Sequence, residues 1–278
     1  MDLKQRLLGS NQQYSRYPLS RFCSSMERLG LGRLDFVPQV PHFWCGHTGY
    51  ESTAGLKAAL AEAGLAVSAL TPPPYRYSIT APDGKQRMAT LDYYRHCIAL
   101  AAELGAGQVV VGAAGACWDL DPAVLRRNAA DMLLTLARLA RDAGIRLLFS
   151  PVMGPDAPLL AESPILGTAA ETAELLDWLD QPSLGVCLDT NVMSVWGGDL
   201  PTWFRLLGGR IRLVRLCDGN YHGYRAWGDG CLPMERYLRQ LDEAGYAGDL
   251  SLLLPGERYV EDPEYPDRAA LRALCGEV

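Results

Sequence analysis

Charged side chains stand where several buried strands are predicted to end, and these positions could carry chemistry. Asp189 follows the apolar run Leu184–Leu188, and Arg215 lies near the end of the run Ile211–Leu216. Successive side chains of a strand alternate between its two faces, so Cys187 shares a face with Asp189, and Leu213 with Arg215. Burying a lone carboxylate is unfavourable, whereas a guanidinium on the neighbouring strand supplies a permanent positive charge. We therefore expect Arg215 to form an ion pair with Asp189.

The elements that position these residues recur along the chain as a helix, a glycine and a short apolar run. Helices are predicted to end near Gly30, Gly64, Gly105, Gly144, Gly208 and Gly245. Short, continuously apolar runs are typical of parallel strands buried on both faces. The predicted strands are Leu7–Ser10 (the weakest), Leu34–Val37, Leu65–Leu70, Gln108–Val111, Ile145–Phe149, Leu184–Leu188, Ile211–Leu216 and Leu250–Leu254.

Local signals mark where helices begin. Asp121 followed by Pro122 predicts a capped helix start, and Thr168 with Glu171 predicts a capping box. Eight strand–helix units with no intervening linker predict one α/β domain over residues 1–278, a (β/α)8 TIM barrel. A doubly wound open sheet is the rival fold, but its Gly-rich first turn is missing from the sequence. In a barrel the working face lies at the carboxyl ends of the strands.

The composition of the chain disfavours several classes of function. The net charge is −6 and the hydrophobic fraction is 49%, which disfavours nucleic-acid binding and suits a large core. The sequence shows neither the apolar stretch of a signal peptide nor a segment that could span a bilayer, so we expect a cytoplasmic protein without a membrane partner. Eight scattered cysteines without a C-x-x-C pair are interpreted as buried thiols.

Seven stretches, in this order, resemble the sugar-phosphate isomerase/epimerase superfamily, the xylose isomerase-like TIM barrels. The resemblance is nearest to the fructoselysine 3-epimerase and ketose 3-epimerase type, and it extends over nearly the whole chain. The stretches are VPQVPHFW, ALTPPPYRY, QRMATLDYY, LLFSP, VCLDTN, VRLCDGN and DLSLLLPGERY.

This resemblance implies a divalent metal (Mn, Co, Mg or Zn) held by glutamate, aspartate, histidine and glutamate on the fifth to eighth strands. The two glutamates would also move the proton between sugar carbons. Here these four positions are Ser150, Asp189, Arg215 and Leu253. A single carboxylate cannot retain a divalent ion against water, and an arginine repels such an ion. Leu253 can neither bind a metal nor transfer a proton. We therefore expect a degenerate metal site without a resident cofactor, and the identity of any catalytic residue stays unknown.

Other polar residues are candidates for binding a substrate. His42 matches a position that the resemblance places near the substrate, although a loop histidine is more often solvated or capping. Asp218, Asn220 and His222 form a polar cluster that could contact a polyol or only line the barrel rim. Together with Asp189 and Arg215, these residues are the predicted binding set. The WGDG stretch beginning at Trp227 is interpreted as a plain turn.

Three functions remain open. The first is a barrel that has lost metal-dependent catalysis and binds a sugar or sugar derivative. The second is a working isomerase or epimerase that uses Asp189, Asp218, His222 or Glu257, or different metal ligands. The third is an assembly subunit, since the resemblance implies homodimers or homotetramers. The DNA-repair branch of the superfamily is disfavoured by the missing metal ligands and basic groove.

Overall fold

Eight parallel strands form the centre of the molecule. The computed structural model describes residues 3–73, 77–82, 84–153 and 162–276. The strands are β1 (Leu7–Leu8), β2 (Arg33–Phe36), β5 (Ala66–Leu70), β6 (Gln108–Gly112), β7 (Arg146–Ser150), β8 (Leu184–Asp189), β9 (Ile211–Arg215) and β12 (Asp249–Ser251). Their order is β1-β12-β9-β8-β7-β6-β5-β2.

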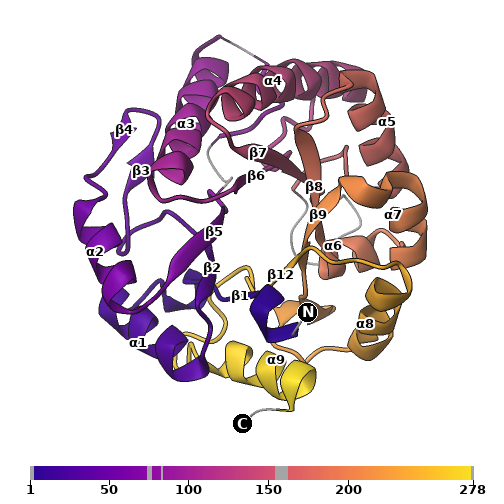
Figure 1. Cartoon of the computed structure of the whole chain (residues 1–278). Helices are drawn as coiled ribbons and strands as arrows, with labels where there is room; N and C mark the ends of the chain where they lie inside the picture. Colours follow the sequence, from indigo (N-terminus) through magenta and orange to yellow (C-terminus); the bar gives the residue numbers. More distant parts are fainter. Residues whose placement is uncertain (1–2, 74–76, 83, 154–161, 277–278) are drawn as a thin grey trace.

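A parallel bridge between Gly9 and Leu34 joins the two ends of this sheet. The Gly9 N–H donates to the carbonyl of Arg33, and the Asp35 N–H donates to the carbonyl of Gly9, both at 2.9 Å. The sheet therefore closes on itself, and Figure 1 shows the ring of strands inside a ring of helices. The predicted TIM barrel is confirmed, and the open doubly wound sheet was the wrong alternative.

One layer of apolar side chains fills the barrel interior. Alternate strand positions supply it, because every second side chain points inward. Its members are Leu8, Ala69, Val110, Leu148, Cys187 and Leu213. Ser150, Asp189 and Arg215 each lie two residues after a member of this layer. The layer is thus the floor beneath the polar residues at the carboxyl ends of the strands.

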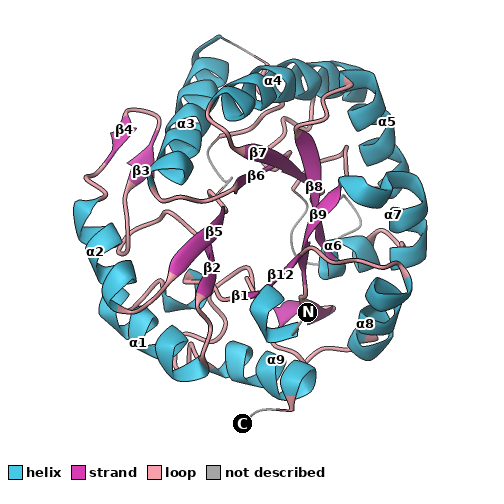
Figure 2. Cartoon of the chain, viewed as in Figure 1, coloured by secondary structure: helices cyan, strands magenta, loops and turns pink. Residues whose placement is uncertain are grey.

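The helices form the outer ring, as the ribbon coloured by secondary structure shows (Figure 2). They are α1 (Leu19–Leu29), α2 (Ala54–Glu62), α3 (Gly84–Glu103), α4 (Pro122–Asp142), α5 (Ala169–Leu179), α6 (Thr190–Val195), α7 (Leu200–Leu207), α8 (Met234–Glu243) and α9 (Tyr265–Cys275). None of the described helices is long and apolar enough to cross a membrane.

The predicted helix signals are confirmed. Asp121 caps α4 by accepting a hydrogen bond from the Ala123 N–H, and Thr168 and Glu171 form the reciprocal capping box of α5. Gly30 ends α1 with φ of 67°, a left-handed conformation that glycine adopts without strain. These contacts are local, which is why the sequence predicted them.

Two small antiparallel hairpins follow strands of the barrel. The pair β3 (Cys45–Gly46) and β4 (Gly49–Tyr50) comes after β2, and the pair β10 (Asp218–Asn220) and β11 (Gly223–Arg225) comes after β9. Both therefore belong to the loops at the carboxyl ends of the strands. The stretch Ala69–Tyr77, part of the resemblance above, includes residues 74–76, which lie outside the described residues.

Candidate functional site

A cavity of about 650 Å³ opens at the carboxyl ends of the strands. This volume lies in the range of small-molecule sites. The four positions that the resemblance assigned to a metal, Ser150, Asp189, Arg215 and Leu253, all border this cavity. Asn220, His222 and Glu257 border it as well, so the structure brings together seven of the residues that the sequence singled out.

Arg215 is held by a buried network at the bottom of this cavity. Its Nη2 donates a hydrogen bond to the Thr71 hydroxyl at 2.6 Å, and its Nε lies 3.5 Å from Oδ2 of Asp35. The Nε has no hydrogen-bond partner, so the contact with Asp35 is a charge interaction. Asp35 also accepts hydrogen bonds from the hydroxyls of Thr71 at 2.5 Å and Ser251 at 2.7 Å. The guanidinium is therefore fixed in place from two directions.

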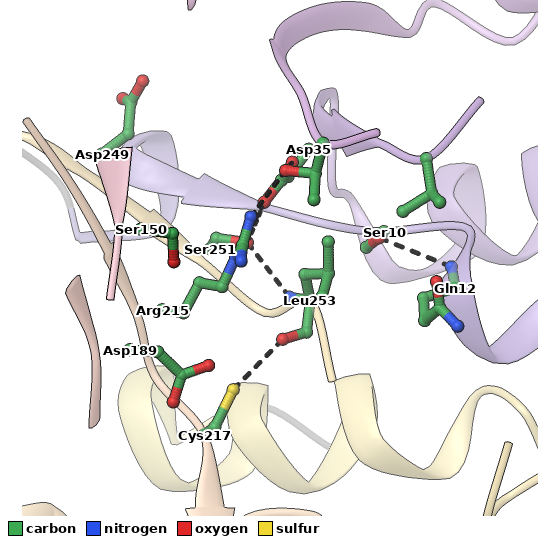
Figure 3. Close-up of polar contacts among 12 residues, drawn as sticks. Ser10, Gln12, Asp35, Ser150, Asp189, Arg215, Cys217, Asp249, Ser251 and Leu253 are labelled. Carbon is green, nitrogen blue, oxygen red and sulfur yellow. Dashed lines mark hydrogen bonds and ion pairs between the residues drawn. The ribbon is translucent and has the colours of Figure 1, made fainter. Parts of the chain in front are cut away.

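The expected ion pair between Arg215 and Asp189 is not formed, and this prediction was wrong. Arg215 reaches toward Asp35, whereas Asp189 lies to the other side (Figure 3). Both carboxylates are buried, but Asp189 is stabilised by two backbone N–H donors at the start of α6, whereas Asp35 receives only hydroxyl donors. The positive charge of Arg215 therefore compensates the buried charge of Asp35. Sequence analysis missed Asp35; its only signal was an acidic residue inside the apolar run Leu34–Val37.

Asp189 is the N-cap of helix α6. Its Oδ1 accepts hydrogen bonds from the backbone N–H groups of Asn191 at 2.8 Å and Val192 at 3.1 Å. Its Oδ2 accepts one from the hydroxyl of Tyr224, on β11, at 3.2 Å. Burial raises the pKa of Asp189, although the nearby positive charge of Arg215 opposes this shift. Asp189 thus serves as the N-cap of α6 as well as bordering the cavity.

Glu162 is a second acid at the cavity that sequence analysis did not identify. It lies in the loop between β7 and α5, and its Oε2 accepts a hydrogen bond from the Met153 N–H at 2.9 Å. The backbone of Glu162 is tied to the carbonyl of Met153 and to the N–H of Gly115. Burial raises the pKa of Glu162, and the negative charge of Asp189 adds to this rise. No periodicity predicts where a loop residue lies, so the sequence carried no signal for it.

His42 and Asp218 lie outside the residues that border the cavity. His42 is buried, its Nδ1 lies 2.9 Å from the Asn11 side-chain amide, and its Nε2 lies 2.9 Å from the Tyr17 carbonyl. Burial lowers the pKa of His42. These contacts join two loops at the barrel rim, which is a structural role.

Asp218 organises the turn that follows β11. Its carboxylate accepts hydrogen bonds from the N–H groups of Gly228 at 3.0 Å, Gly230 at 3.2 Å and Leu232 at 3.1 Å. The interpretation of the WGDG stretch as a turn is therefore confirmed. The carboxylate of Asp218 is occupied by backbone donors.

The rim of the cavity carries further polar groups. The Asn220 side chain accepts a hydrogen bond from the His222 N–H at 2.9 Å, and the Arg258 guanidinium donates to the His222 carbonyl at 3.0 Å. Glu257 forms an ion pair with Arg16, with 2.6 Å between Oε2 and Nη2. That pairing lowers the pKa of Glu257. The rim is thus held by its own hydrogen bonds.

Asn191, which borders the cavity, carries a buried hydrogen-bond donor without a partner. Its side-chain Nδ2 is buried and has no hydrogen-bond partner among the described residues, although Asn191 borders the cavity. Buried donors are rarely left unpaired in folded proteins, because each loses its hydrogen bonds to water. Because Nδ2 is shielded from solvent in the free protein, a ligand in the cavity reaches this donor only after the Asn191 side chain turns.

The donor set does not fit a divalent metal. Among the described residues, no group of three or more His, Cys, Asp or Glu side chains is placed to hold a metal ion. Arg215 brings a permanent cation to the same cavity, and Leu253 offers no ligand atom there. The one acid of the four positions, Asp189, is already bonded to two backbone donors.

Comparisons with known proteins agree with this architecture. Residues 33–275 match the family described as xylose isomerase-like TIM barrel. The chain is 24% identical over 271 residues to fructoselysine 3-epimerase from Shigella flexneri, covering 95% of this chain and 96% of the relative.

Solved structures show the same fold. A 3-keto-D-glucoside 4-epimerase from E. coli superimposes with a TM-score of 0.76 at 18% identity, covering 96% of this chain and 99% of the other. A D-allulose 3-epimerase from Methylomonas sp. gives a TM-score of 0.78 at 18% identity, with 98% of both chains covered.

Proposed function

Because this chain belongs to the xylose isomerase-like TIM barrel family, we propose that it binds a small sugar or sugar derivative in the cavity at the barrel mouth. It does so without the resident divalent metal and without the metal-dependent proton transfer that the resembled enzymes use. The name of the 24% identical relative, fructoselysine 3-epimerase, supports a sugar-derived ligand.

One observation carries this proposal: the guanidinium of Arg215 is fixed by Asp35 and Thr71 inside the cavity. A divalent ion bound beside it would have to overcome like-charge repulsion in a buried setting. The lost ligands at Ser150 and Leu253 leave too few oxygen or nitrogen atoms to compensate for that repulsion. The cavity nevertheless keeps its floor and its polar rim, so it still suits a neutral polyhydroxylated molecule.

A sugar fits the polar groups around this cavity. Its hydroxyls both donate and accept hydrogen bonds, so they can meet the carboxyl groups of Asp189 and Glu162 and the unpaired amide of Asn191. Apolar neighbours such as Val37, Val110 and Val192 also line the cavity and can cover the C–H faces of a ring. A mostly apolar wall with a few placed polar groups is the usual composition of a small-molecule site.

The experiment is a binding screen on protein treated with a chelator. Thermal shift and isothermal titration calorimetry would test D-fructose, D-tagatose, D-allulose, L-ribulose and a glycated lysine. A ligand that binds only the folded state stabilises it by RT ln(1 + [L]/Kd), so the melting temperature rises with the logarithm of the ligand concentration once that concentration exceeds Kd. We expect at least one of these compounds to bind with EDTA present.

The variant Asn191→Ala tests where the ligand binds. Its side-chain donor is unpaired in the free protein, so its removal should leave the stability nearly unchanged while weakening the ligand about 5- to 10-fold, the loss of one hydrogen bond. Gln240→Ala on α8 is the matched control, since its buried Oε1 is also unpaired but lies away from the cavity. Binding that appears only after Mn²⁺ is added, or equal loss in both variants, contradicts the proposal.

A further inference from the structure

Three carboxyl groups border the cavity in the described part of the chain, and they differ in how they are engaged. Asp189 has both oxygens in hydrogen bonds, and Glu257 is tied to Arg16 and to the Ser15 hydroxyl. Glu162 receives one hydrogen bond, from the Met153 N–H to Oε2. Among the described residues, no cation lies within 4.0 Å of Glu162 or Asp189. Glu162 therefore has an oxygen left for a ligand.

We propose that Glu162 is the base of a metal-independent proton transfer on a sugar carbonyl whose oxygen is held by Arg215. The inference rests on the proposed function, because it requires a sugar in this cavity. A general base needs a fixed position at the substrate and a basicity suited to neutral pH. The backbone contacts of Glu162 with Met153 and Gly115 fix its position beside the cavity. Burial raises the pKa of Glu162, which makes its carboxylate a stronger base than an exposed one.

Arg215 would take the electrophilic role. Its guanidinium keeps its charge at every physiological pH and is already oriented by Thr71 and Asp35, so it needs little reorganisation when charge develops on a carbonyl oxygen. Asp35 does not border the cavity and is a positioning residue for Arg215.

The step balances without a co-reactant. The Glu162 carboxylate takes a proton from the carbon next to the carbonyl, and the C–H electron pair becomes the new C=C bond. The carbonyl oxygen becomes an enediolate oxygen beside Arg215. Protonated Glu162 then returns the proton to the former carbonyl carbon, while the hydroxyl proton of the first carbon passes to the oxygen of the second. An aldose and a ketose interconvert, and the protein ends in its starting state.

The geometry also favours transfer on one face of the sugar. Inversion at a single carbon needs a proton donor on each side of the substrate. Glu162 lies in the loop after β7, and Asp189 is the last residue of the neighbouring strand β8. The position after β12 is Leu253, which carries no transferable proton. Glu257, in the same loop, is held by Arg16 and its pKa is lowered, so it is a weak base. One base on one face moves a proton between adjacent carbons without inverting either.

The test follows deuterium incorporation by NMR and mass spectrometry. Chelator-treated protein, with its metal content measured by elemental analysis, would be incubated in D₂O with D-fructose, D-tagatose or D-allulose. We expect deuterium at C-1 of the ketose and formation of the corresponding aldose, unchanged by EDTA. Glu162→Gln keeps an acceptor for the Met153 N–H but cannot take a proton, so the exchange should fall by about 100-fold or more.

Controls separate this inference from the proposed function. Glu174→Gln, an exposed substitution on α5, should leave the exchange rate unchanged. Glu162→Gln should still bind the ketose by calorimetry, which excludes loss of folding. A ketose that binds without C-1 exchange overturns the inference and leaves the proposed function standing. Exchange that requires added metal, exchange at C-3 with an inverted product, or equal exchange in Glu162→Gln also overturns it. If none of the ketoses binds, both fail.

Discussion

The Nε of Arg215 lies 3.5 Å from Oδ2 of Asp35, and the two side chains are 8% and 0% exposed. They come from β9 and β2, which are not neighbours in the barrel. Each charge partly compensates the free-energy cost of burying the other. The hydroxyls of Thr71 and Ser251 donate hydrogen bonds to the two carboxylate oxygens of Asp35. This pair gives the barrel mouth a permanent cation without any bound ion.

Breaking this pair on one side should be strongly destabilising. Asp35→Asn leaves the Arg215 guanidinium buried without its counter-charge, and we expect the free energy of unfolding to fall by about 3 kcal/mol or more. Arg215→Met should also destabilise, because Asp35 is then buried alone. Urea denaturation followed by circular dichroism would measure both variants.

The double variant Asp35→Asn/Arg215→Met distinguishes a coupled pair from two independent contacts. Once both charges are gone, neither is left uncompensated, so the combined loss should be clearly smaller than the sum of the two single losses. Simple additivity of the two effects would contradict a coupled pair.

Asp267 should make the stability depend on pH. It is buried at the start of α9, and burial together with the negative charge of Glu264 raises its pKa to about 8, against an opposing effect of Arg268. The folded state therefore binds a proton that the unfolded state has lost, from about pH 4 to about pH 8. Because the folded state binds more protons, the stability falls as pH rises through this window, by up to about 1.4 kcal/mol per pH unit.

Asp267→Asn should remove this dependence, because the amide has no proton to lose. Thermal and urea unfolding would be measured between about pH 5 and about pH 8. The free energy of unfolding of Asp267→Asn should depend less on pH than that of the unmodified protein, and it should be higher at the alkaline end. Asp131→Asn, at an exposed position of α4, is the matched control and should leave the profile unchanged. An unaltered slope in Asp267→Asn would show that other groups cause the dependence.

Metal binding should be recoverable by restoring the lost ligands together. The triple variant Ser150→Glu, Arg215→His and Leu253→Glu adds three ligands around Asp189 and removes the cation, since all four positions border one cavity. We expect stoichiometric Mn²⁺ uptake by the triple variant and none by the three single variants, measured by elemental analysis after gel filtration.

Asp189→Asn added to the triple variant is the control, and it should weaken Mn²⁺ binding by removing a charged ligand. Stoichiometric, tight Mn²⁺ binding by the unmodified protein would refute the proposed absence of a resident metal.

The amino-acid sequence by itself determined the fold and the inward face of the strands β7, β8 and β9. Leu148 and Ser150, Cys187 and Asp189, and Leu213 and Arg215 are spaced by two, so a strand must present both members of each pair on one side. The helix caps at Asp121 and Thr168 could also be predicted from the sequence, because a cap involves residues only two or three positions apart.

Only the tertiary structure decided which side chains these polar residues contact. Asp35 could not be matched to Arg215 from the sequence, because closure of the barrel, and not proximity along the chain, brings β2 and β9 to a common interior. Asp189 does not pair with Arg215, because it is the N-cap of α6 and its carboxylate accepts hydrogen bonds from the N–H groups of Asn191 and Val192. Glu162 borders the cavity where its own hydrogen bonds with Met153 and Gly115 hold it, and Gly115 lies far from it along the chain. Periodicity fixes which way a side chain points from its own strand, but long-range contacts fix what it meets there.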